Sequence, residues 1–153
     1  MDTTSTVSRD QYLHEAQFAL FACQMVEETL KSTLMYAREV NSLAPTEYVS
    51  VEKTDDELDE LPLGPLIKQY ERVFPTSSAT ASLHALRPER NHCAHRALVL
   101  CFMSNVKDGL SLQAEFSRIE SARKLAWSCF EHLKVEMQTA AQRLEVLRAK
   151  SAG

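Results

Sequence analysis

Apolar residues recur at alternating spacings of four and three along the first part of the chain. Ser8 and Gln11 form a capping box at the start of this pattern, which predicts one helix over about 8–41. Such a seam is typical of long helices that pack side by side in a bundle. The predicted seam consists of Tyr12, Ala16, Ala19, Cys23, Val26, Leu30, Thr33, Ala37 and Val40.

The last part of the chain repeats this pattern and predicts a second long helix over about 111–149, with Ser111 as its cap. Arg123 alone breaks the second seam. Its long side chain either passes the edge of the seam to reach water or directs a cation into a cleft. The remaining seam positions are Leu112, Phe116, Ile119, Ala126, Phe130, Leu133, Met137, Ala140, Leu144 and Leu147.

Shorter elements are predicted between the two long helices. Residues 41–53 form a connection because Pro45 blocks continuation of the first helix. Thr54 and Glu57 form another capping box, and a further helix follows over 61–74 with Pro65 in its first turn.

A last short helix is predicted from Pro88, with "ERNHCAHRALVLCFMS" as its body and with 75–82 before it as a polar loop or a weak helix start. The sequence therefore predicts an all-α fold: an up-down helical bundle with two long antiparallel helices and two or three shorter ones. We expect a single domain over 1–153, with a core from about 8 to 150.

Composition narrows the functional classes. The chain has only three glycines and no G-x-G-x-x-G or G-x-x-x-x-G-K-[ST] loop, which removes the usual cradle for dinucleotides and nucleoside triphosphates. Its four cysteines form no C-x-x-C pair and lie in apolar helical patterns, so they are predicted to be buried thiols in a reducing cytosol. No secretory h-region opens the chain, and the longest apolar run, 97–103, is too short to cross a membrane. We expect a cytoplasmic protein without membrane association.

The candidate chemistry lies in "RPERNHCAHRAL" (87–98). This stretch carries three arginines and two histidines with Glu89 as its only acid, although the formal net charge of the chain is -4. It is either a solvated helix start or a phosphate site. His92 and His95 are three residues apart and could bind a metal ion together. Cys93 is nearby but points to another side of the helix, and the sequence shows no other third ligand.

Helical geometry divides this stretch between two faces. His95 shares one face with Asn91, four residues earlier, and with the apolar Val99 and Phe102. The opposite flank, around Cys93, suits the core of the bundle. An apolar group beside His95 predicts that its face is also covered, and a second subunit is the simplest cover. The sequence therefore predicts a homodimer through the His95 face.

The segment "RNHCAHR" resembles the R-x4-6-H signature of HEPN domains, in which a polar residue usually follows the arginine, here Asn91. "LGPLIKQY" and "LHALRPE" are similar to the second helix and the lead-in of small stand-alone HEPN proteins. The architectural resemblance covers about 8–150, and the specific motif covers only 90–96. Some HEPN toxins carry H-x-Y, whereas here the tyrosine position is Ala97, so neutralisation by modifying that tyrosine is not implied.

The resemblance implies a metal-independent endoribonuclease with its site at a homodimer axis and no cofactor. His95 would be the general acid or base at the ribose 2′-hydroxyl or the leaving oxygen. Arg90, about 140° around an α-helix from His95, would neutralise the phosphate from the other chain. Asn91 would orient His95 or donate to the phosphate. Arg87 and Arg96 would supply the remaining local cationic surface for RNA.

A second function class remains open. The chain is acidic and has little basic surface outside 87–96, which suits a non-catalytic HEPN-like regulator or a partner-binding protein. A catalytic chain would fit a toxin or a defence effector. Either reading allows an antitoxin or a nucleotidyltransferase as the partner.

Overall fold

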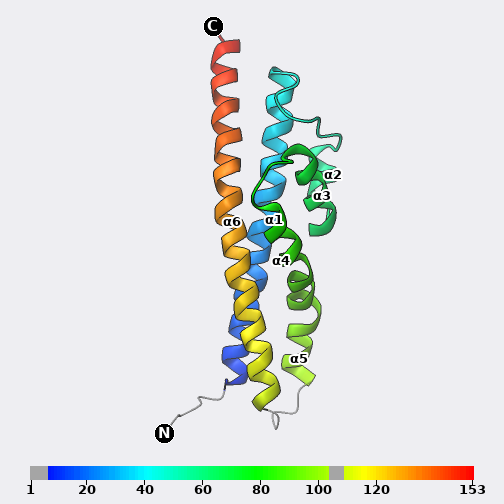
Figure 1. The fold of residues 1–153 in the computed structure, drawn as a ribbon, viewed down its shortest axis with the longest axis vertical. Helices are drawn as coiled ribbons and strands as arrows, with labels where there is room; N and C mark the ends of the chain where they lie inside the picture. The colour runs from blue at the N-terminus through cyan, green and yellow to red at the C-terminus, as the bar shows by residue number, and fades with distance from the viewer. Residues whose placement is uncertain (1–6, 104–108) are drawn as a thin grey trace.

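The computed structural model describes residues 7–103 and 109–153, and all regular structure in these two ranges is helical (Figure 1). The predicted all-α fold is therefore confirmed. The elements are α1 (Arg9–Leu43), α2 (Asp55–Asp59), α3 (Leu63–Val73), α4 (Thr80–His92), the π-helix η1 (Cys93–Ala97), α5 (Leu98–Met103) and α6 (Gly109–Ser151).

Helix α1 follows the sequence pattern closely. The Gln11 backbone N–H donates to Ser8 Oγ at 3.2 Å, and the Ser8 N–H donates to the Gln11 side chain at 2.9 Å, so the predicted capping box is present. All nine positions of the predicted seam are buried. The second predicted capping box, Thr54 with Glu57, begins α2.

The two long helices lie side by side and run in the same direction, so the predicted antiparallel arrangement is wrong (Figure 1). Glu15 near the start of α1 pairs with Arg123 of α6, and Glu39 near the end of α1 pairs with Arg148 at 2.5 Å. Later residues of α1 thus pair with later residues of α6, as two helices that run in the same direction require. A heptad seam fits either orientation, and here the descending α4–η1–α5 run returns the chain to the start of α6, so α1 and α6 ascend together.

The core has two parts. The larger part joins α1, α3, α4 and α6 around residues such as Leu30, Leu66 and Leu133. The smaller part brings η1 against the early turns of both long helices, through Cys93 and Ala97. The seam of α6 is buried or partly buried at every position from 112 on. The predicted cap is wrong, because α6 begins at Gly109 and Ser111 lies inside the helix.

Helix α4 begins earlier than the sequence predicted. Pro88 is inside α4 rather than at its start, and the helix extends back to Thr80. Leu83 and Leu86 are fully buried, so their core contacts stabilise helix upstream of the proline. Pro88 removes one backbone N–H without ending the helix. Across the described residues, no helix combines the length and the apolar character that a membrane crossing requires.

Candidate functional site

His95 lies in the π-helix η1, between α4 and α5. Cys93 and Ala97 of this turn face the core, whereas His95 and Arg96 are exposed. A π-helix bonds i to i+5, so each residue advances by less than the 100° of an α-helix. The turn therefore reduces the angle between Arg90 and His95 below the 140° of a regular helix. Single π-turns of this kind occur frequently at functional sites.

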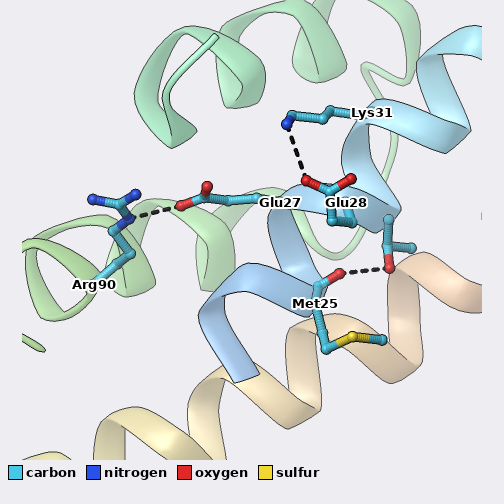
Figure 2. A network of polar contacts seen from close by, with 6 residues as sticks. Met25, Glu27, Glu28, Lys31 and Arg90 are labelled. Atoms are coloured by element: carbon cyan, nitrogen blue, oxygen red, sulfur yellow. Dashed lines mark hydrogen bonds and ion pairs between the residues drawn. The ribbon is translucent and has the colours of Figure 1, made fainter. Parts of the chain in front are cut away.

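Arg90 is directed toward α1 and does not contact His95. Its Nε donates to Glu27 Oε1 at 2.7 Å (Figure 2). The Arg90 side chain is 25% exposed and the Glu27 side chain 13% exposed. The terminal guanidinium nitrogens make no other hydrogen bond or ion pair among the described residues. Glu27 thus compensates the charge of Arg90 and holds its orientation while the donor fork remains available.

Two further pairs attach α4 to α6. His92 is buried, and its Nε2 lies 2.7 Å from Glu115. Arg118 binds both carboxylate oxygens of Glu89 at 2.8 and 3.2 Å, and these hydrogen bonds raise the pKa of the Arg118 guanidinium. These contacts give His92 a structural role. Because His92 is committed to Glu115 inside the bundle and His95 is exposed, the structure does not support a metal pair of these two residues.

Asn91, His95 and Arg96 form the exposed part of the motif. None of their side chains makes a hydrogen bond or an ion pair with another residue that the structure describes. Beyond them, Val99 is 48% and Phe102 70% exposed. Among the described residues this face, which was predicted to be covered, is therefore largely exposed, and Arg9 lies over the Phe102 ring at 5.4 Å from its centroid.

Arg87 lies on a different side, against α3. A Cβ added to Gly64 would stand 2.8 Å from Arg87 Nε, so the glycine permits the close approach of this guanidinium. Of the five predicted site residues, one chain gathers Asn91, His95 and Arg96 on its surface. It directs Arg90 toward α1 and Arg87 toward α3.

Sequence reasoning missed the acidic partners of the motif. Glu27 is 63 positions from Arg90, and no local pattern connects them. The heptad pattern places Glu27 beside the buried Val26 and four residues after Cys23, which marks it as a boundary position. It does not indicate which helix supplies the cation.

Three cysteines behind the motif are buried and free, as predicted: Cys23, Cys93 and Cys129. Burial raises the pKa of the Cys23 thiol to about 12 and those of the other two to about 11. These thiols stay protonated at neutral pH and are poor nucleophiles. The side chain of Cys101 lies outside the described residues.

The thiol pKa values predict a loss of stability at high pH. In the unfolded chain the Cys23 thiol loses its proton near pH 9, whereas in the folded chain it keeps it to about pH 12. The contribution of the Cys23 thiol to the free energy of unfolding is therefore complete below pH 9. It decreases as the pH rises toward 12, and at pH 10 it is lower by about 1 kcal/mol. Urea unfolding at pH 7 and pH 10 should show the stability gap between wild type and Cys23→Ala narrowing by this amount. An unchanged gap would contradict the raised pKa.

Comparison of the chain with protein-family models, with curated proteins and with solved structures gives no match in any of the three.

Proposed function

We propose that this chain is a metal-independent endoribonuclease of the HEPN type, which works as a homodimer. The observation that carries the proposal is His95. It is exposed on a π-turn, free of any described partner, and accompanied on the same surface by Asn91 and Arg96. A histidine without an internal bond is free to exchange protons with a substrate.

The proposed reaction uses the ribose 2′-hydroxyl of the RNA as its nucleophile. His95 removes or returns the proton at the 2′-oxygen or the leaving oxygen. The terminal nitrogens of Arg90 donate to the phosphate as charge develops on its oxygens. Glu27 is a positioning residue, because it holds Arg90 through Nε and leaves these nitrogens available. Asn91 orients His95 or donates to the phosphate, while Arg87 and Arg96 attract the RNA backbone.

The dimer supplies what one chain lacks. Within one chain Arg90 pairs with Glu27, and no hydrogen bond joins it to His95. The exposed Val99 and Phe102 extend the surface of His95 and offer apolar area for a second copy. In a two-fold dimer through this surface, Arg90 of one chain is proposed to face His95 of the other.

One observation favours a second candidate function. Glu27 pairs with Arg90 and Glu115 with His92, so two of the five basic side chains of 87–98 already have a carboxylate partner within the fold. A non-catalytic HEPN-like regulator would use the same exposed surface to bind a partner protein. For either function we propose a cytoplasmic location, because three buried free thiols suit a reducing compartment. An antitoxin or a nucleotidyltransferase is the proposed partner class.

The proposal is tested by incubating purified protein with single-stranded RNA in the presence of EDTA. Cleavage should persist in EDTA, because no metal participates. It should fail at any position where the ribose lacks its 2′-hydroxyl, since that oxygen is the nucleophile. It should weaken steeply with salt, because the phosphate contacts are electrostatic. A folded dimer that cuts no RNA under these conditions would favour the regulator.

A further inference from the structure

A second site lies between α1 and α6, where Arg123 interrupts the seam. A cleft of about 380 Å³ opens there, within the roughly 300–1,000 Å³ of small-molecule sites. Arg123 lines this cleft, and its side chain is 28% exposed. The lining residues are His14, Glu15, Phe18, Arg123 and Trp127.

The polar groups of this cleft are an ion pair in which a single hydrogen bond joins the two side chains. Arg123 Nε donates to Glu15 Oε1, and the two side chains are 28% and 15% exposed. The terminal nitrogens of Arg123 and the second oxygen of Glu15 have no other partner among the described residues. Hydrogen-bond donors and an acceptor thus stand side by side at fixed positions.

Aromatic rings form the walls around this pair. Trp127 is held by an edge contact with Phe130, with centroids 5.5 Å apart, and by Phe21 at 6.3 Å. His14 packs edge-on against Phe18 at 4.7 Å, and Phe18 remains 46% exposed. These ring contacts hold side chains that line the cleft together with Arg123 and Glu15.

The chemistry of the cleft selects one kind of ligand. Arg123 already provides the cation beside the rings and repels an ammonium group, while Glu15 repels a simple anion. A neutral planar heterocycle can stack on the rings and bond to both charged groups. Guanine presents the adjacent acceptors O6 and N7, which match the arginine fork, and its N1–H and N2 amino donors suit a carboxylate.

We propose that the cleft between α1 and α6 binds a guanine base, supplied by a free guanine nucleotide or by single-stranded RNA. The site does not depend on the proposed ribonuclease activity. It shares none of the residues of the motif on α4 and η1.

Trp127 is the only tryptophan of the chain and therefore reports directly on the cleft. Titration of the full chain with GMP should quench its fluorescence saturably. AMP should bind about tenfold more weakly, because its N6 amino group meets the arginine donors. Inosine monophosphate, which lacks the N2 amino group, should lie between them. The RNA arm compares an oligoadenylate with one that contains a single guanine.

Variants separate recognition from packing. Arg123→Lys and Glu15→Gln should each weaken GMP binding about tenfold by calorimetry, with helicity checked by circular dichroism. Arg143→Lys is the matched control. Arg143 lies on α6 away from the cleft and pairs with Glu47, so its substitution should leave GMP binding unchanged.

Binding of GMP alone, or of the guanine-containing RNA alone, supports the site and identifies the source of the base. No saturable binding of either probe, equal binding of AMP and GMP, or variants that bind like wild type would overturn it. Cleavage of a guanine-free RNA by the same variants should be unaffected. The outcome for the cleft is therefore separate from the outcome for the ribonuclease.

Discussion

His95→Ala should reduce RNA cleavage by about 10²–10⁴-fold, which is the usual contribution of one general acid or base. The loss should appear in kcat rather than in KM, because the proposed role of His95 is proton transfer in the transition state rather than binding of the RNA. Single-turnover cleavage of a defined single-stranded RNA in EDTA is the measurement.

The variant is expected to fold normally. His95 is exposed and makes no hydrogen bond or ion pair with the described residues, so its removal should change stability by no more than about 0.5 kcal/mol. His132→Ala is the matched control: it removes another exposed histidine, on α6, and should cut RNA like wild type. If His95→Ala cuts as fast as the control, His95 is not the catalytic group.

The regular part of the fold could be predicted because it depends on local pattern. The apolar seam of α1 and its capping box are encoded within neighbouring turns, and all nine seam positions are buried. The direction of α6 relative to α1 could not be predicted, since a heptad repeat is satisfied by either orientation. Pro88 predicts a helix start because proline favours the first turn, but the contacts of Leu83 and Leu86 with the core override that preference.

The candidate site could be predicted only in part for a similar reason. Helical spacing placed Cys93 in the core and Asn91 with His95 on a separate face, and the structure agrees, but that face is exposed in the single chain rather than covered. The π-turn left no signal, because one extra residue per turn changes no residue type. The ion pair of Arg90 with Glu27 joins two helices far apart in sequence and depends on tertiary packing.

The proposed site, shared between two chains, makes a second prediction that no single-chain site can satisfy. Arg90→Ala and His95→Ala should each be inactive as homodimers. Mixed and allowed to exchange subunits, they should recover activity, because one of the two sites in the heterodimer then combines an intact Arg90 with an intact His95. Half of the dimers are heterodimers and each has one working site, so about a quarter of the wild-type rate is expected.

Arg90→Ala also removes the partner of Glu27, which is 13% exposed, so its stability must be measured beside its activity. Arg90→Lys keeps the positive charge near Glu27 but loses the planar fork, and it should complement His95→Ala in the same way. Phe102→Glu places a charge on the apolar surface beside His95 and should shift the protein to monomer in sedimentation. When introduced into both partners, it should abolish the recovery. A site divided between two chains must reappear in the heterodimer. Mixed variants that remain inactive while sedimenting as stable dimers would therefore show that each chain carries a complete site or none.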